Sequence, residues 1–341
     1  MNIQRVAKEA GVSITTVSRV MNNPEAVSET TRKKVLSVIE GLNYTPNWFA
    51  RNLQNKRTNV IGVFIPDTLE QSCMELVKGI EKVARKKGCN IIICNTNYNE
   101  AEERKNVENL AAGKIDGLIL ISSSLKKEDL RQLEKKKVPV VLTDRTDLQK
   151  SHSVVSTDYR EATKSAIEHF LEMGRRKIAM IVSKDAKFIG EYKKEGYFDA
   201  IKESCYDIQY VNVIEAEDSI KGGLIAAGKL LAQNCRPDAI FAATDTMAFG
   251  VLERIRQADL TVEDIGVIGY DGLETGAITE PKLTTVAKPS YKMGLTAARL
   301  LFDKIKDKEE EQEYSPESVV LQSRLKIRKS CGNKERLREI W

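Results

Sequence analysis

The sequence is poor in the side chains from which metal sites and histidine-based active sites are built. Its 341 residues include two histidines, His152 and His169, and six scattered cysteines that form no Cys-x-x-Cys pair. Transition metals are held mainly by such side chains at short spacings, so we expect no metal site and free cysteine thiols. The dinucleotide, phosphate-loop and nucleophile-elbow motifs (G-x-G-x-x-G, G-x-x-x-x-G-K-S/T and G-x-S-x-G) are also missing. These absences argue against an enzyme, and we expect no cofactor.

Long apolar runs are lacking as well. No stretch approaches the roughly 20 apolar residues of a membrane-spanning helix, and the start MNIQRVAKEAG lacks the apolar core of a signal peptide. We therefore expect a cytoplasmic protein that does not contact membranes. At roughly 100–200 residues per domain, the length predicts two or three domains.

Positive charge is concentrated in one short part of the chain. The net charge is +5, and residues 1–57 contain nine of the 54 basic side chains but only four of the 49 acidic ones. The rest of the chain is therefore balanced. A basic module joined to a neutral body predicts an N-terminal part that binds a polyanion and a body with a different task.

The basic module has the pattern of a helix-turn-helix. Apolar residues recur at helical spacing over residues 3–10, and Gly11 can end that helix. Ser13 can cap a second helix over residues 14–21, and a third helix is predicted at about 29–41. In a helix-turn-helix the second helix lies in the DNA major groove. The module is therefore predicted to bind double-stranded DNA.

The outward face of the second helix carries the side chains expected to contact DNA. Arg19 can bind both guanine acceptors, and Ile14 and Thr15 can contact thymine methyl groups. The basic run at residues 32–34 either approaches phosphate or forms a solvated helix face, and both interpretations stay open. Hydroxyl and amide side chains suit phosphates, which fix the register without reading the sequence. The residues predicted for that role are Ser13, Thr16 and Asn22.

Several stretches of the sequence resemble one family. The segments VAKEAGVSITTVSRVMN and VSETTRKKVLSVIEGLNYTPNWFARN are similar to the lactose-repressor family of bacterial transcription regulators. The similarity continues through KIDGLIL, ATDTMAFGVL, IGYDG and PKLTTV to RLKIRKSC and so covers nearly the whole chain. It implies a sequence-specific regulator, most simply a repressor of carbohydrate-utilisation genes.

The resemblance divides the chain into a DNA-binding domain, a hinge and a body of two lobes that resembles periplasmic sugar-binding proteins. In the family, a hinge leucine from each subunit enters the minor groove of the operator, and that leucine corresponds to Leu53. The alternative is a plain tether. The expected boundaries are 1–46 for the helix-turn-helix, 47–57 for the hinge, 58–331 for the body and 332–341 for a tail. Within the body, we expect a first lobe of about 58–157 and 287–317 and a second lobe of about 158–286 and 318–331.

The body shows short apolar runs that alternate with helical segments. Examples are VIGVFI (60–65), NIIIC (90–94), DGLILI (116–121) and KIAMIV (177–182). Buried runs separated by helices are typical of parallel sheets, and the chain contains two such series. We therefore predict an α/β body of two parallel sheets flanked by helices, preceded by an all-α N-terminal domain.

Polar side chains follow the ends of the predicted strands, where ligands bind in open parallel sheets. Carboxylate and hydroxyl oxygens at these ends suit a small ligand with many hydroxyl groups. Single residues of this kind also occur because loops are exposed to water. The residues predicted to bind an effector are Asp67, Ser72, Cys73, Asp144, Lys187, Lys193, Asp245 and Asp271.

The resemblance assigns roles to some of these positions. Asp271 corresponds to the effector-contacting aspartate of the family's Gly-Tyr-Asp motif. Lys193 stands where the family has arginine, so a planar bidentate contact is not expected. Ser72 and Cys73 stand where purine-sensing members have aromatic residues, which argues against a nucleobase and favours a sugar or a sugar acid. Lys187 and Lys193 favour the acid.

A two-fold homodimer accounts for the paired hinges and for a pseudo-palindromic operator. The tail GNKERLREIW offers less than two heptads, unlike the C-terminal helix of tetrameric relatives, so we predict a dimer. The small-molecule effector would change the angle between the lobes and thereby either release DNA or favour its binding. An alternative is a catabolite-control regulator whose activity is controlled mainly by a phosphorylated protein partner.

Overall fold

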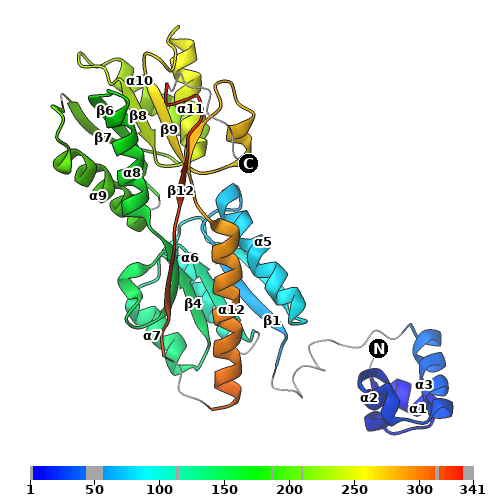
Figure 1. The fold of residues 1–341 in the computed structure, drawn as a ribbon. Coiled ribbons are helices and arrows are strands. Elements are labelled where there is room, and N and C mark those ends of the chain that lie inside the picture. Colours follow the sequence, from blue (N-terminus) through cyan, green and yellow to red (C-terminus); the bar gives the residue numbers. More distant parts are fainter. Residues whose placement is uncertain are drawn as a thin grey trace. The chain divides into compact units, whose positions relative to one another are not determined.

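The computed structural model describes residues 3–43, 57–112, 115–185, 187–208, 210–311 and 315–332. The chain divides into two compact units, Met1–Asn59 and Val60–Trp341, which we call the N-terminal unit and the body. The predicted hinge, with Leu53, and the predicted tail lie almost entirely outside the described residues. Figure 1 shows the helices and strands of both units.

The N-terminal unit is helical. Gly11, at φ +62°, ends the first helix, and Ser13 Oγ accepts a hydrogen bond from the backbone N–H of Thr16 at the start of the second. The helices meet in a small core that includes Val17 and Val35. The predicted helix-turn-helix is confirmed. Its elements are α1 (Ile3–Ala10), α2 (Ile14–Asn22), the 3-10 helix η1 (Pro24–Ala26) and α3 (Glu29–Gly41).

The body contains two six-stranded sheets, one in each lobe (Figure 1). In sheet order, the first consists of β11 (Ser318–Leu321), β5 (Ser153–Thr157), β4 (Val140–Thr143), β3 (Gly117–Ile121), β1 (Val60–Ile65) and β2 (Asn90–Asn95). The second consists of β12 (Arg324–Lys326), β10 (Thr284–Ala287), β9 (Gly266–Asp271), β8 (Ala239–Ala242), β6 (Lys177–Ser183) and β7 (Tyr210–Ala216). All described pairings are parallel except that of β12 with β10.

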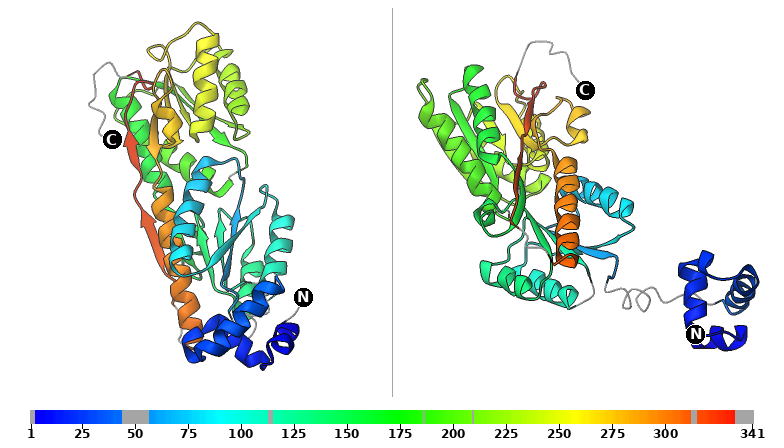
Figure 2. Two further views of the ribbon diagram at one scale, coloured as in Figure 1. Left: turned by 90° about the vertical axis from the view of Figure 1, so that its right-hand side faces the viewer. Right: turned by 60° about the horizontal axis from the view of Figure 1, so that its bottom comes forward.

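Helices flank both sheets, as Figures 1 and 2 show, and the predicted α/β architecture is confirmed. None of the helices in the described part of the chain is long and apolar enough to cross a membrane. The first lobe has α5 (Gln71–Lys86), α6 (Glu100–Ala111), α7 (Lys127–Lys135), η2 (Thr146–Leu148) and α12 (Ser290–Glu309). The second has α8 (Tyr159–Glu172), α9 (Lys187–Glu203), α10 (Ile220–Leu231), α11 (Asp245–Gln257) and η3 (Glu274–Ala277).

The chain passes between the lobes after β5, after β10 and between β11 and β12. Strand β11 pairs with β5 of the first sheet, whereas β12 pairs with β10 of the second. The expected change of lobe between residues 317 and 318 is therefore wrong. The first lobe extends to Leu321, because residues 318–321 supply the outer strand of its sheet.

The apolar run at residues 90–94 forms β2, but it is not buried as a central strand would be. Strand β2 lies at the edge of its sheet, and Ile92 and Ile93 are 38% and 41% exposed. An apolar run does not by itself distinguish an edge strand from a central one. Strand β7, an edge strand of the second sheet, was not predicted, because its apolar residues are interrupted by Asn212 and Glu215.

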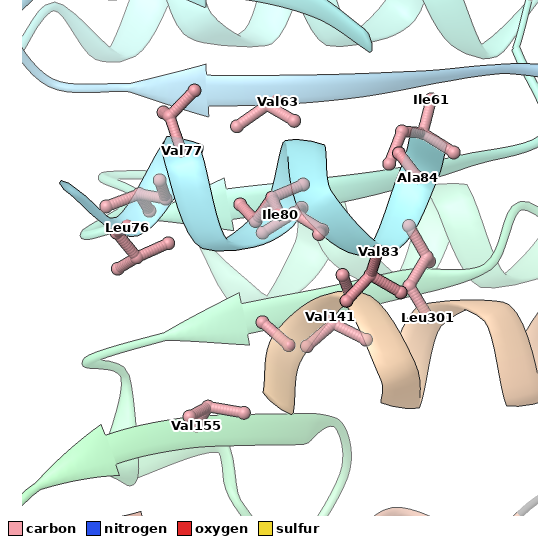
Figure 3. Packing of buried hydrophobic residues seen from close by; sticks show 14 of the residues in the cluster. Ile61, Val63, Leu76, Val77, Ile80, Val83, Ala84, Val141, Val155 and Leu301 are labelled. Atoms are coloured by element: carbon pink, nitrogen blue, oxygen red, sulfur yellow. The ribbon is translucent and has the colours of Figure 1, made fainter. Parts of the chain in front are cut away.

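The core of the first lobe lies between its sheet and the helix pair α5 and α12. Figure 3 shows Ile80 and Val83 of α5 above Ile61 and Val141 of the sheet, with Leu301 of α12 beside them. Burying apolar side chains of this size contributes about 1.5–3 kcal/mol each. This core fixes the strands whose ends form the first wall of the site described below.

Helices α5 and α12 also touch through their backbones. A Cβ atom on Gly79 would lie 2.3 Å from the carbonyl oxygen of Tyr291, and one on Gly294 would lie 2.0 Å from that of Leu76. Both distances are far below van der Waals contact. The two glycines therefore allow a helix packing that no larger residue permits.

Candidate functional site

Helix α2 presents the predicted base-contacting side chains on one exposed face. Ile14, Thr15 and Arg19 are exposed, whereas Val17 and Val20 of the same helix are buried. The apolar residues anchor the helix in the core of the unit and leave the other face accessible. The arrangement agrees with the helical spacing in the sequence, and base contact stays a prediction.

The predicted phosphate-contacting residues are described in part. The hydroxyl groups of Ser13 and Thr16 are hydrogen-bonded to each other, with 2.9 Å between Oγ and Oγ1. They lie at the start of α2, where backbone N–H groups favour an anion. The side chain of Asn22 lies outside the described residues.

The basic run at residues 32–34 has acidic neighbours. Arg32 lies 3.6 Å from Glu25, and Lys33 lies 2.8 Å from Glu29, both as exposed ion pairs. Exposed pairs of this kind contribute little, about 0–1 kcal/mol. They agree with a solvated helix face and leave the side chains available for phosphate.

A cavity that opens to solvent lies between the two lobes of the body and is lined by both. Its walls include the ends of β6 and β9 and the segments that follow several strands, the region expected for a ligand in parallel sheets. Of the predicted effector residues, Ser72, Cys73, Lys193 and Asp271 line it, whereas Asp67, Asp144 and Asp245 do not. The side chain of Lys187 lies outside the described residues.

Asp144 lies behind the cavity wall and holds two of its side chains. It is 1% exposed and accepts hydrogen bonds from Tyr159 (2.7 Å) and Ser122 (3.1 Å). The Nζ atom of Lys288, which lines the cavity, lies 3.6 Å from Asp144 Oδ2. Burial lowers the pKa of Lys288, but Asp144 and neighbouring acidic groups raise it above its ordinary value. Lys288 is therefore held in its charged form.

Lys193 of α9 is buried in the wall formed by the second lobe, and the protein itself binds its ammonium group. Its Nζ donates a hydrogen bond to the carbonyl oxygen of Ala243 (2.6 Å) and lies 3.7 Å from the centre of the Tyr270 ring. Burial lowers the pKa of Lys193 to about 8, although Asp271 acts in the opposite direction. Burial also raises the pKa of Asp271 well above its ordinary value, although Lys193 opposes this.

Asp245 ties together the elements beneath the cavity. It is fully buried at the start of α11 and accepts hydrogen bonds from Thr285 Oγ1 (2.6 Å) and from the backbone N–H of Leu273 (2.7 Å). Gly269 leaves room for the carboxylate, since a Cβ atom there would lie 2.3 Å from Asp245 Oδ1. The structure therefore does not support direct contact between Asp245 and an effector, which the strand-end pattern had predicted.

The buried carboxyl group of Asp245 predicts a pH dependence of stability. Burial raises its pKa to about 7 in the folded protein, above the roughly 4 of an unfolded chain. The protonated carboxyl group therefore stabilises the folded state fully below about pH 4, and this stabilisation is lost as the pH rises towards about 7. We expect the melting temperature to fall more over this range in the parent protein than in Asp245→Asn, whose amide can keep both hydrogen bonds if Thr285 accepts one. Parallel profiles of melting temperature against pH would contradict this prediction.

Most cavity-lining residues were not included in the predicted set, and five of them are charged or form a side-chain hydrogen bond to a charged cavity residue. Tyr98 follows β2, and both Asn97 and Tyr98 adopt left-handed backbone conformations, at φ 50° and 55°. Such conformations are strained in residues other than glycine and cluster at functional sites. The Tyr98 hydroxyl donates a hydrogen bond to the carboxylate of Glu70. The five residues are Glu70, Tyr98, Asp218, Thr244 and Lys288.

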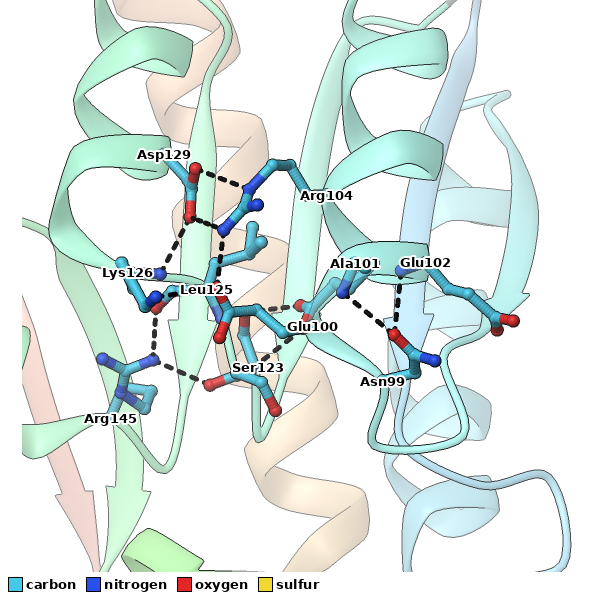
Figure 4. A network of polar contacts seen from close by, with 12 residues as sticks. Asn99, Glu100, Ala101, Glu102, Arg104, Ser123, Leu125, Lys126, Asp129 and Arg145 are labelled. Atoms are coloured by element: carbon cyan, nitrogen blue, oxygen red, sulfur yellow. Dashed lines mark hydrogen bonds and ion pairs between the residues drawn. The ribbon is translucent and has the colours of Figure 1, made fainter.

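A polar network fixes the first-lobe loops beside the cavity, as Figure 4 shows. Arg145 Nη1 donates hydrogen bonds to the carbonyl oxygens of Ser123 (2.7 Å) and Leu125 (2.9 Å). Next to it, Arg104 Nε donates to Asp129 Oδ1 (2.8 Å). The network joins the ends of β3 and β4 to the start of α7 and so makes this side of the site rigid.

Helix α9 of the second lobe contacts the first lobe directly. The guanidinium group of Arg145 lies 4.3 Å from the centre of the Phe188 ring of α9. Thr146 Oγ1 lies 2.6 Å from the hydroxyl oxygen of Tyr192 of the same helix, to which it donates a hydrogen bond. Such contacts depend on the angle between the lobes. The cleft is therefore bridged on this side in the structure described.

Both units match one family of known proteins. Residues 2–47 match "Bacterial regulatory proteins, lacI family", and residues 58–329 match "Periplasmic binding proteins and sugar binding domain of LacI family". The catabolite control protein A of Priestia megaterium is 36% identical over 303 residues, which are 88% of this chain and 91% of that protein. The HTH-type transcriptional repressor PurR of Vibrio vulnificus (strain CMCP6) is 32% identical over 330 residues, which are 95% of this chain and 99% of that protein.

The solved structures agree with the sequence relatives. The lac repressor dimer bound to operator and the anti-inducer ONPF has a TM-score of 0.83 and 26% sequence identity to this chain. The match covers 97% of this chain and 99% of that one. With a helix-turn-helix unit and a two-lobed body that both match the same family, the chain belongs to the LacI family of DNA-binding transcriptional regulators.

Proposed function

We propose that this regulator represses carbohydrate-utilisation genes and that a sugar-class effector bound between the lobes controls its affinity for the operator. The cavity carries the proposal, because hydroxyl, carboxyl and ammonium groups from both lobes line it. A ligand in this place contacts both lobes and binds with different strength when their angle changes. Such differential binding is what allows a ligand to shift a conformational equilibrium. The description of the matched family, which names a sugar-binding domain, supports the same proposal.

The cavity has more aromatic surface than the sequence indicated. Ser72 and Cys73 are not aromatic, but Tyr98 and Tyr159 line the same space from other segments. The absence of an aromatic pair at positions 72 and 73 is therefore a weaker argument against a nucleobase. The preference for a sugar rests instead on the many hydrogen-bonding groups that surround these rings.

The DNA-binding part of the proposal depends on Arg19. Replacing Arg19 with alanine is expected to cost about 1–3 kcal/mol of binding free energy on the operator and to relax specificity at one base pair. The full chain would first be used to select an operator from random DNA, and fluorescence anisotropy would then compare affinities. The control is Lys8→Ala, which removes an exposed positive charge from α1. It should lower the binding affinity for all DNA sequences equally. Equal losses on operator and random DNA for the Arg19 variant would identify a phosphate contact.

We propose that the regulator acts as a homodimer. The exposed apolar side chains of the edge strand β2 support this, because an unpaired apolar edge is normally covered in a stable protein. Sedimentation equilibrium of the full chain at micromolar concentration should give the mass of two chains. A mass of four chains would contradict the prediction drawn from the short tail.

A second candidate function is control by a phosphorylated protein partner. The 36% identity to the catabolite control protein A favours it. A pull-down with a phosphorylated carrier protein, compared with its unphosphorylated form, tests this function. Calorimetry with sugars on the same preparation tests the first one.

A further inference from the structure

Two carboxylates line the cavity, one from each lobe. Glu70 precedes α5 in the first lobe, and Asp218 precedes α10 in the second; both line the cavity. The hydrogen-bond partners of Glu70 are the Tyr98 hydroxyl and the Cys73 thiol, and Asp218 accepts from Thr244 Oγ1 at 2.7 Å. Among the side chains that the structure describes, no lysine or arginine nitrogen forms an ion pair with either carboxylate within 4.0 Å.

The two described ammonium groups of the cavity are occupied elsewhere. Lys288 pairs with the buried Asp144, and Lys193 is held by the carbonyl oxygen of Ala243 and by the Tyr270 ring. Their charges still act on the cavity, Lys288 on Glu70 and Lys193 on Asp218, but the protein already supplies partners for both. The expectation that lysines favour an acidic effector stays a prediction at Lys193.

The electrostatics of the two walls agree with this geometry. Burial raises the pKa of Glu70 and the Asp218 carboxylate raises it further, whereas its hydrogen bonds and Lys288 lower it in part. Burial also raises the pKa of Asp218, together with Asp185 and Asp67, whereas the Thr244 hydrogen bond and Lys193 lower it in part. Nearby like charges disfavour the ionised form, and an opposite charge between them would favour it. A cationic group in the cavity would thus be attracted by both lobes at once.

We propose that the effector carries a protonated amine, as an amino sugar does, and that its ammonium group binds between Glu70 and Asp218. The inference rests on the proposed function, since it concerns the ligand of the same cavity. Charge-assisted hydrogen bonds from one ammonium group to carboxylates of both lobes stabilise the closed cleft. The hydroxyl groups of the sugar then have Ser122, Asp271 and the Tyr98 loop as neighbours.

The first test compares matched sugars on the full-length protein without DNA. The amino sugars glucosamine and galactosamine are compared with two matched pairs: the neutral sugars glucose and galactose, and the acids glucuronate and galacturonate. The pH is slightly below neutral, so that the sugar amine is protonated. The thermal shift measures how much each sugar stabilises the protein, and calorimetry measures its binding affinity. At least one amine is expected to bind about tenfold or more tightly than its neutral counterpart, the effect of a hydrogen bond to a charged group. Equal shifts throughout the series, including none at all, or a stronger effect of a neutral or acidic sugar, would overturn the inference.

The second test removes the two charges one at a time. Glu70→Gln and Asp218→Asn should each weaken binding of the amine about tenfold or more while leaving the neutral sugar unchanged. The control is Glu217→Gln, which removes an exposed charge beside Asp218 and should leave the preference intact. Unchanged selectivity in both cavity variants would contradict the inference even if sugars bind. The proposed function is judged separately, by operator selection and by the effect of any bound sugar on operator affinity.

Discussion

Replacing Lys288 with methionine is expected to lower the free energy of unfolding by about 3–5 kcal/mol, the usual cost of leaving one partner of a buried ion pair. The side chains of Lys288 and Asp144 are 8% and 0% exposed, so the pair is largely shielded from water. The hydrogen bonds of Asp144 to Tyr159 and Ser122 remain, but they do not neutralise its charge. Urea unfolding of the body at neutral pH measures the loss.

A double variant separates the lost charge from the changed packing. Lys288→Met combined with Asp144→Asn removes both charges and should recover most of the stability, because the penalty comes from the unpaired charge. The control is Lys292→Met, an exposed position in α12, the helix that follows Lys288; it should change stability by less than about 0.5 kcal/mol. A double variant as unstable as Lys288→Met alone would show that the methionine side chain disturbs the packing instead.

Replacing Gly294 with alanine is expected to destabilise the first lobe by about 3 kcal/mol, the upper part of the range for overpacking. The added Cβ atom would lie 2.0 Å from the carbonyl oxygen of Leu76 and 3.1 Å from the backbone nitrogen of Ile80. Both belong to the α5 backbone, which cannot rotate away as a side chain can. Helices α5 and α12 must therefore separate, and their shared core against the sheet is lost in part.

The matched control for this prediction is Gly228→Ala in α10. Its added Cβ atom would lie 3.2 Å from Nε of Arg254, part of a flexible side chain. The higher helix propensity of alanine offsets this crowding, so a change within about 1 kcal/mol is expected. Thermal unfolding of both variants tests the comparison, and equal losses would show that helix separation is not the cause.

Features that depend on a few consecutive residues could be predicted from the sequence. Gly11 and Ser13 mark the turn of the helix-turn-helix, because chain reversal and helix capping are local requirements. The apolar runs that form β1, β3 and β6 are buried on both faces and are therefore continuous in the sequence. Strand β7 was missed because it is an edge strand with mixed exposure. The lobe boundary was misplaced because nothing local marks which sheet β11 joins.

The cavity could be predicted only in part. Position after a strand selected Asp271, and the family resemblance selected Lys193. The strand-end rule also selected Asp245, whose carboxylate accepts hydrogen bonds from Thr285 and the backbone of Leu273. The rule does not distinguish a carboxylate that is hydrogen-bonded within the protein from one that faces a ligand. The pairing of Glu70 with Asp218 depends on how two separate lobes meet, which no local pattern records.

The central claim is that a ligand in the cavity between the lobes controls DNA binding. Its most direct test is the affinity of the full chain for its selected operator, measured by fluorescence anisotropy with and without a sugar that stabilises the protein. A change of about 5- to 150-fold in either direction is expected, the usual range of allosteric coupling, and a smaller change in Asp271→Asn. A sugar that binds the cavity tightly and leaves operator affinity unchanged would contradict the central claim.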